Sequence, residues 1–198
     1  MKRIYVMMLL LFLSFSFDAQ AQETIKVVAT IGQITDVVRK IGGERVSVQG
    51  LMGPGVDPHL YKASESDVRK LSKADIIFYN GINLEAKLGQ ILKNLKRSKE
   101  VVAVGETIPT ELLLESLDYK GHYDPHIWFD VVLWIDVVKS VWATLAEYDP
   151  EHKQEYFERA STYIQELEQL HEYVQAKSQE IPEGQRVLVT AHDAFRYF

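Results

Sequence analysis

The chain has 198 residues, 46% of them hydrophobic, which is enough for one complete domain and part of a second. Its formal net charge of −6 argues against a nucleic-acid-binding function. Cysteine is absent, which excludes disulfides and limits any metal site to histidine, carboxylate and water ligands.

Residues 1–21 have the pattern of a secretory signal peptide. Lys2 and Arg3 precede an apolar run from Ile4 to Phe17, and Ala19-Gln20-Ala21 is an A-x-A cleavage site. The run is about 14 residues long, shorter than the ~20 that a membrane-spanning helix needs. We therefore expect cleavage near Ala21 and a periplasmic protein, with no lipid anchor because there is no cysteine to modify.

Between residues 25 and 104, short apolar runs alternate with segments of helical periodicity. The predicted strands are 25–30, 46–51, 76–79 and 101–104, and the predicted helices are 33–41, 64–74 and 84–95. Ser64-x-x-Asp67 resembles a capping box at the start of the second helix. Strands that alternate with helices predict an α/β fold, a parallel sheet with helices on both faces.

The second half of the chain is mainly helical. One helix is predicted from residue 131 to about 148, and Asp149-Pro150 supplies an N-cap and a first-turn proline for a longer helix that ends before Pro182. Such a helix would reach roughly 45 Å, longer than one small domain needs. We interpret it as a rigid connection between two lobes, and we predict that residues 186–190 form the first strand of the second lobe.

Asp-Pro-His occurs twice, at residues 57–59 and 124–126. Proline fixes its own φ and keeps the preceding residue extended, so each histidine leaves a stiff turn in a restricted direction. The neighbouring aspartates could accept the second imidazole N–H, which would leave one ring nitrogen free for a metal ion. His192 directly follows the predicted strand 186–190, a position where ligands bind in open parallel sheets.

The residues alone leave a second interpretation open. Asp-Pro is a common turn dipeptide, and each histidine could simply follow it onto the surface. His122 lies four residues before His126, which is ligand spacing on a helix, but Gly121 and Pro125 disfavour a helix there. We therefore predict a metal site of His59, His126 and His192, without His122.

These motifs together resemble the zinc- and manganese-binding solute receptors of ABC importers, the TroA-like or cluster A-I family. The resemblance covers nearly the whole chain, including Gly53-x-x-x-Asp57-Pro58-His59, Asp124-Pro125-His126-Ile127-Trp128 and Ala191-His192-Asp193-Ala194-Phe195-x-Tyr197-Phe198. It implies two α/β lobes joined by one rigid helix, with the ion in the cleft between them. The first three ligands of the family match His59, His126 and His192.

The resemblance also implies a domain organisation. Residues 22–148 would form an N-terminal metal-binding lobe, residues 149–184 the connecting helix, and residues 185–198 the start of a truncated C-terminal lobe. The fourth ligand of the family, an aspartate, belongs to that second lobe and has no counterpart here. We expect a monomeric receptor that passes its ion to an ABC-type permease and catalyses no reaction.

Two other functions stay open from the sequence. A periplasmic zinc enzyme could hold its metal with three histidines and an open position, although no HExxH helix is present. A receptor for an organic ligand, such as haem or a siderophore, could share the plan of two lobes joined by a helix. For the cargo, the resemblance implies a histidine- and acid-rich loop before the second ligand in the zinc-importing branch of the family, and the short segment 105–125 with its single histidine therefore favours manganese slightly. A histidine at position 192 instead favours zinc, because it makes the site richer in nitrogen.

Overall fold

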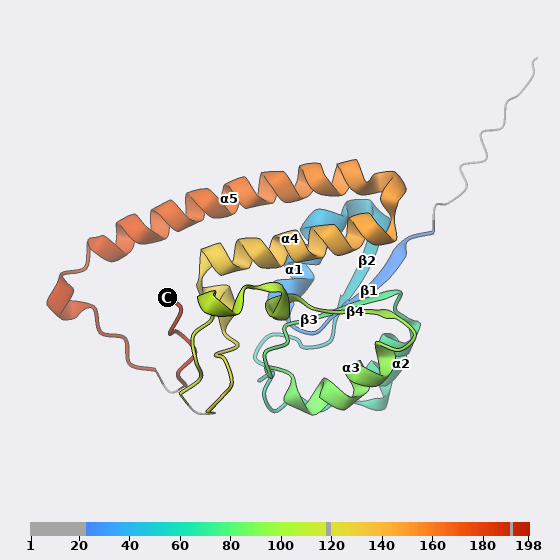
Figure 1. The fold of residues 1–198 in the computed structure, drawn as a ribbon, viewed down its shortest axis with the longest axis horizontal. Helices are drawn as coiled ribbons and strands as arrows, with labels where there is room; N and C mark the ends of the chain where they lie inside the picture. Colours follow the sequence, from blue (N-terminus) through green and yellow to red (C-terminus); the bar gives the residue numbers. More distant parts are fainter. Residues whose placement is uncertain (1–22, 118–119, 191) are drawn as a thin grey trace, which may run out of the picture.

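A four-stranded parallel sheet organises the part of the protein that the structure describes (Figure 1). The computed structural model describes residues 23–198 apart from 118–119 and 191, so the predicted signal peptide, residues 1–21, lies outside the described residues. The strands are β1 (Ile25–Ala29), β2 (Val46–Gly50), β3 (Ile76–Tyr79) and β4 (Glu100–Ala103), in the order β2-β1-β3-β4. All neighbours are parallel, and Val27 lies opposite both Val48 of β2 and Ile76 of β3.

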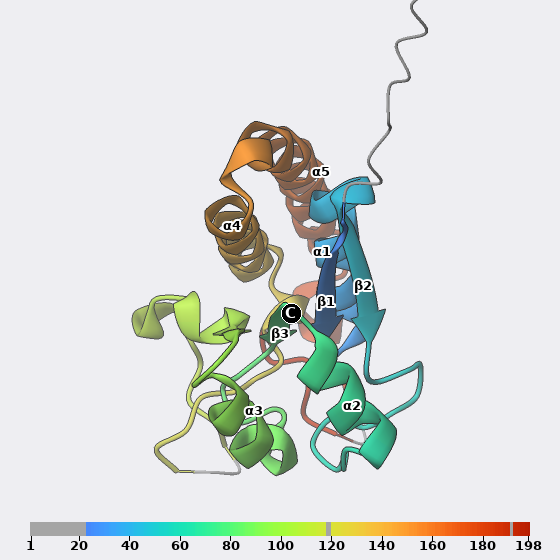
Figure 2. The ribbon, with the colours of Figure 1, turned by 90° about the vertical axis from the view of Figure 1, so that its right-hand side faces the viewer.

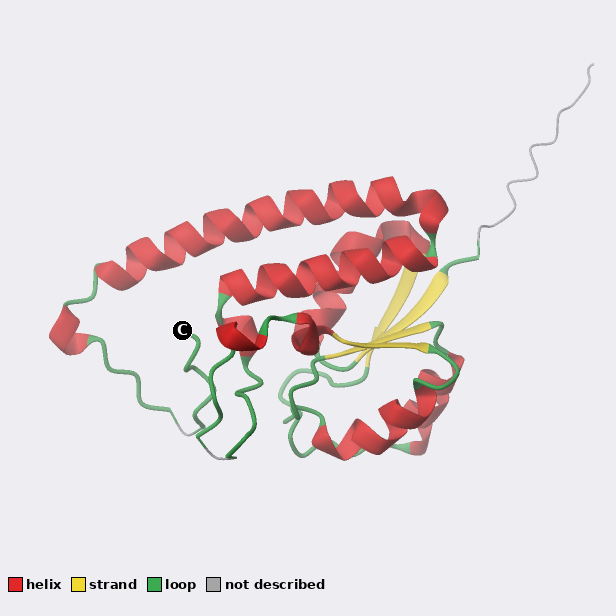
Figure 3. Cartoon of the chain, viewed as in Figure 1, coloured by secondary structure: helices red, strands yellow, loops and turns green. Residues whose placement is uncertain are grey.

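Helices cover both faces of this sheet (Figures 2 and 3). On one face lie α1 (Gly32–Gly42), α4 (Val131–Tyr148) and α5 (Lys153–Gln179), and on the other lie α2 (Glu65–Lys73) and α3 (Gly89–Leu95). Short 3-10 helices occupy Gly43–Arg45, Ala86–Leu88, Val104–Thr107, Thr110–Leu112, Ile127–Phe129, Pro150–His152 and Glu183–Gln185. The predicted α/β class with helices on both faces is confirmed.

The central strands are apolar at successive positions because both of their faces are covered. Val27, Val28 and Ala29 are all buried, although their side chains alternate between the two faces. At the start of α2, the predicted capping box is present: Ser64 Oγ accepts from the Asp67 backbone N–H, and the Asp67 carboxylate accepts from the Ser64 backbone N–H. Local sequence patterns therefore predict the central strands and the start of α2 correctly.

Helix α5 is the longest element, with 27 residues and a length of roughly 40 Å. Tyr156, Ala160 and Leu167 are its buried residues, and Figure 1 shows its C-terminal part extending beyond α4. Its N-terminal end is fixed by Asp149, which pairs with Arg45 at 2.9 Å. In the described part of the chain, no helix combines the length and the apolar character needed to cross a membrane. That α5 connects two lobes stays a prediction.

The predicted strand at residues 186–190 is wrong. Val187, Leu188 and Val189 are 77%, 62% and 88% exposed, and the segment has an irregular backbone. A β-strand is stabilised by a ladder of backbone hydrogen bonds to a neighbour, and among the described residues no strand pairs with this segment. Apolar, β-branched composition alone is therefore not enough to form a strand in this segment.

A smaller difference from the prediction occurs earlier in the chain. The helix predicted at 84–95 is divided into the 3-10 helix Ala86–Leu88 and α3.

Candidate metal centre

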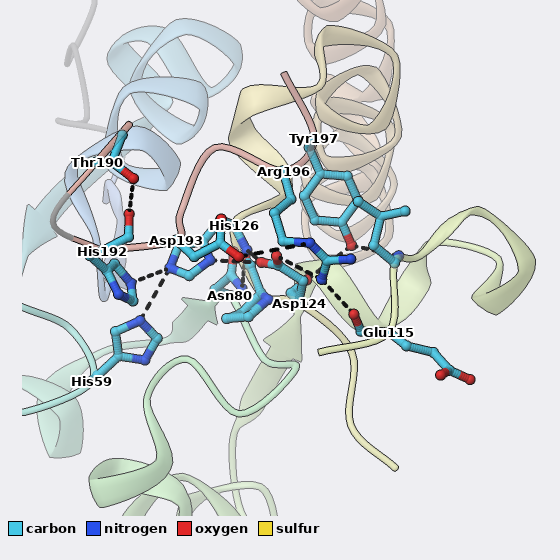
Figure 4. A network of polar contacts seen from close by, with 12 residues as sticks. His59, Asn80, Glu115, Asp124, His126, Thr190, His192, Asp193, Arg196 and Tyr197 are labelled. Atoms are coloured by element: carbon cyan, nitrogen blue, oxygen red, sulfur yellow. Dashed lines mark hydrogen bonds and ion pairs between the residues drawn. The ribbon is translucent and has the colours of Figure 1, made fainter. Parts of the chain in front are cut away.

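Three histidines from distant parts of the sequence meet beyond the carboxyl ends of the strands (Figure 4). His59 lies in the loop after β2, His126 directly precedes the 3-10 helix Ile127–Phe129, and His192 comes from the segment after α5. The Nε2 atom of His126 is 3.2 Å from Nε2 of His59 and 3.1 Å from Nε2 of His192. One ligand atom from each ring lies within 4.8 Å of the other two. The structure thus brings together the three residues that the sequence singled out.

These separations suit a single small metal ion. Zinc binds imidazole nitrogen at about 2.0–2.1 Å, so two nitrogens of a tetrahedral site lie about 3.4 Å apart. The Nε2–Nε2 separations of 3.2 Å and 3.1 Å fall just below this value. His126 is buried, His59 is partly buried and His192 is exposed, so the group opens toward solvent on the His192 side.

The two Asp-Pro-His motifs share one hydrogen bond from the histidine backbone to the aspartate side chain, but they differ in the contact between the aspartate and the histidine ring. Asp57 Oδ1 accepts from the His59 backbone N–H at 2.9 Å, and Asp124 Oδ1 accepts from the His126 backbone N–H at 3.0 Å. Asp124 Oδ1 also lies 2.7 Å from the ring Nδ1 of His126. This contact favours the tautomer with the proton on Nδ1, which leaves the Nε2 lone pair free.

The electrostatics of His59 favour the form that binds metal. Burial of the imidazole, followed by the effect of the nearby His126, lowers the pKa of His59 below its ordinary value. A neutral imidazole offers a lone pair, whereas an imidazolium does not. The lowered pKa therefore favours the neutral His59 ring, which keeps a nitrogen lone pair.

The C-terminal segment is attached to the loop that carries His126. Arg196 Nη1 lies 3.7 Å from Asp124 Oδ2 and donates to the Glu115 carbonyl at 2.6 Å. Tyr197 Oη donates to the Asp124 carbonyl at 3.0 Å and accepts from the Leu114 backbone N–H at 3.0 Å. These bonds place His192, four residues before Arg196, beside His126.

The three histidines line one side of a cavity of about 540 Å³. His122 and Asn83 also line it, and the His122 ring hydrogen-bonds to the Asn83 side chain. In the described part of the chain, the group of potential metal ligands contains His59, His126 and His192 but not His122.

Sequence reasoning assigned no role to Arg196 or Asn80. Arg196 lies four residues after His192. Asn80 directly follows β3, and its position at the carboxyl end of a parallel strand was a usable signal. Neither residue belongs to the repeated motif. Arg196 and Asn80 contact the loop of His126 only because distant segments pack together, which the sequence pattern does not show.

The chain is similar to known proteins whose names refer to metal uptake or metal binding. A family model described as "Zinc-uptake complex component A periplasmic" matches residues 27–198. Zinc-binding protein TroA of Treponema pallidum is 49% identical over 183 residues, covering 92% of this chain and 59% of that protein. Manganese-binding lipoprotein MntA of Bacillus subtilis is 42% identical over 183 residues, covering 92% and 60%.

Solved structures agree with the sequence relatives. The periplasmic zinc-binding protein TroA from Treponema pallidum superposes with a TM-score of 0.86 at 48% identity, over 89% of this chain and 63% of that one. Fe(III)-bound YtgA from Chlamydia trachomatis gives 0.80 at 32% identity, over 88% and 61%. The chain spans about 60% of the length of the curated relatives it matches. On these matches, the chain belongs to the family of zinc-uptake complex component A periplasmic proteins.

Proposed function

We propose that this chain is the metal-capturing part of a periplasmic receptor that delivers a divalent ion, zinc or manganese, to an ABC-type permease. The observation that carries the proposal is the convergence of the His59, His126 and His192 Nε2 atoms at separations that suit one ion. Its relatives support it, since one is named a zinc-binding protein and another a manganese-binding lipoprotein.

In this proposal the ion is cargo, and no bond in a substrate is made or broken. Three neutral imidazoles donate lone pairs, and Asp124 fixes the direction of the buried one. Three protein ligands leave at least one position of a tetrahedral ion open. The family resemblance predicts that an aspartate from a second lobe would fill this position.

The proposal is tested by titrating metal-free protein with zinc in the presence of a competing chelator. Replacing His59, His126 or His192 with alanine should each weaken binding at least about tenfold, because each change removes one ligand. His171→Ala is the matched control, since His171 lies on α5 outside the ligand group and bonds Gln175. If the three variants bind zinc as tightly as His171→Ala does, the site lies elsewhere.

The same titration with manganese addresses the choice of ion. A nitrogen-rich site should bind zinc at least as tightly as manganese, whichever ion the cell imports. Growth of a deletion strain starved of each metal in turn would identify the physiological cargo. Rescue by zinc alone would contradict the slight preference for manganese that the short segment 105–125 suggests.

The periplasmic location and the monomeric state are also part of the proposal. The location is supported by the pattern of residues 1–21 and by the periplasmic description of the matching family. Sequencing the N-terminus of protein recovered from the periplasm should find cleavage near Ala21. Light scattering should give the mass of one chain, and an intact Met1 or a dimer mass would contradict these points.

A further inference from the structure

The turn that follows β3 has an unusual backbone. Gly81, Ile82 and Asn83 are consecutive residues with positive φ, at 77°, 52° and 62°. For a β-branched residue such as Ile82 this conformation is rare. Such conformations persist only where the surroundings hold them in place, and they occur often at functional sites. This turn also lines the cavity of the three histidines through Ile82 and Asn83.

A buried carboxylate holds this turn. Glu85 is 4% exposed and accepts three hydrogen bonds, from Thr30 Oγ1 at 2.6 Å, from the Asn80 backbone N–H at 2.8 Å and from the Gly81 backbone N–H at 3.1 Å. Thr30 directly follows β1, and Asn80 directly follows β3. Glu85 therefore links the turn to the carboxyl ends of β1 and β3, the two central strands of the sheet.

Asn80 extends this support to the loop of His126. Its side chain is fully buried, and its Nδ2 group donates to the Gly81 carbonyl and to the Pro125 carbonyl, both at 3.1 Å. Pro125 lies between Asp124, which bonds the His126 ring, and His126 itself. Figure 4 shows Asn80 beside Asp124 and His126.

The backbone of Asn80 is also fixed. The Gly105 N–H donates to the Asn80 carbonyl at 2.8 Å, and a Cβ at Gly105 would lie only 2.7 Å from that oxygen. Residue 105 must therefore be glycine for the two segments to approach this closely. The amide of Asn80 thus projects from a fixed backbone toward a loop 45 residues away.

We propose that Asn80 is a positioning residue for the His126 ligand, and that Glu85 fixes Asn80 for this task. The bond to Pro125 sets where the Asp124-Pro125-His126 turn lies, and hence where Nε2 of His126 points. The effect on metal affinity rests on the proposed function, whereas the effect on the turn does not. An experiment can therefore contradict the proposed metal-binding function while the ordering of the turn by Asn80 still holds.

The test compares Asn80→Ala and Asn80→Asp with Asn94→Asp. Asn80→Ala removes the donor without adding charge, and Asn80→Asp keeps the shape but places carboxylate oxygens near two carbonyls. Asn94 is exposed on α3, so Asn94→Asp adds the same charge away from the site. If Asn80→Asp fails to fold, Asn80→Ala decides the question.

The first measurement is amide hydrogen exchange in metal-free protein. The His126 N–H, which bonds Asp124 Oδ1, should exchange about tenfold faster or more in the Asn80 variants, because the turn loses a bond that fixes it. The amides of β1 should keep the protection of the parent. If the His126 N–H is as protected in Asn80→Ala as in Asn94→Asp, the proposal is overturned.

The second measurement is zinc affinity, with the visible absorption of bound Co²⁺ as a report of ligand geometry. The Asn80 variants should bind zinc about tenfold more weakly, the scale of losing a partner that orients a ligand, and the Co²⁺ spectrum should change. Faster exchange with unchanged affinity would show that Asn80 orders the turn without positioning the ligand, and would overturn the proposal. If His126→Ala binds zinc like the parent while Asn80→Ala still speeds exchange, the proposed function fails and the ordering of the turn stands.

Discussion

Replacing Asp124 with asparagine should weaken metal binding without unfolding the protein. Asparagine keeps the shape of the side chain, and its oxygen can still accept from the His126 N–H groups. It removes the charge that makes the 2.7 Å contact with His126 Nδ1 strong. This contact matters more once the ion draws electron density from the ring, so the loss should appear mainly in metal affinity.

The magnitude follows from the two kinds of hydrogen bond. A charge-assisted bond contributes about 1.5–3 kcal/mol and a neutral one about 0.5–1.5 kcal/mol, so the exchange costs about 1–2 kcal/mol. This corresponds to a loss of roughly 5- to 30-fold in affinity, which overlaps the range for partners that orient metal ligands. Competition titration with zinc measures the loss, and circular dichroism of the metal-free variant checks the fold.

The first Asp-Pro-His motif provides the matched control. Asp57 makes the same backbone bond to His59 as Asp124 makes to His126, and it is exposed. Asp57→Asn should therefore change zinc affinity by less than about threefold, since charges in solvent are well screened. Equal losses in Asp57→Asn and Asp124→Asn would refute the reasoning, because the ring contact distinguishes the two motifs.

Three further changes test other parts of the structure. Arg196→Gln should weaken zinc binding at most about fivefold, because a partly exposed pair contributes under about 1 kcal/mol; a loss as large as that of Asp124→Asn would contradict this. Asp149→Ala should cost about 3 kcal/mol in urea unfolding, because it leaves the largely buried Arg45 without its partner; a cost below about 1 kcal/mol would show that the pair does not fix α5. Burial alone would raise the pKa of Asp67, but hydrogen bonds, foremost from Ser64, lower it below its ordinary value. Its stabilising contribution is therefore fully present above the unfolded pKa of about 3.9 and is lost as the pH falls below that value and through the lower folded pKa. The difference in unfolding free energy between the parent and Asp67→Asn should already shrink as the pH falls from about 5 to about 3, and a constant difference would contradict this.

The sequence alone determined the features that depend on neighbouring residues. Hydrophobic periodicity located the four strands, and the capping box at Ser64 and Asp67 needs only three residues of separation. The stiff turns before His59 and His126 also follow from local chemistry, because proline restricts its own φ and the residue before it. These signals were enough to predict the sheet and to single out the histidines.

Only the tertiary structure decided how these parts act on one another. Val187 to Val189 have the composition of a strand, yet they form none here, because strand formation requires a partner. The two Asp-Pro-His motifs look equivalent in sequence, but only Asp124 contacts a ring, and only its turn receives the bond from Asn80. Hydrogen bonds between residues far apart in the chain depend on how the segments pack, and no local pattern encodes that geometry.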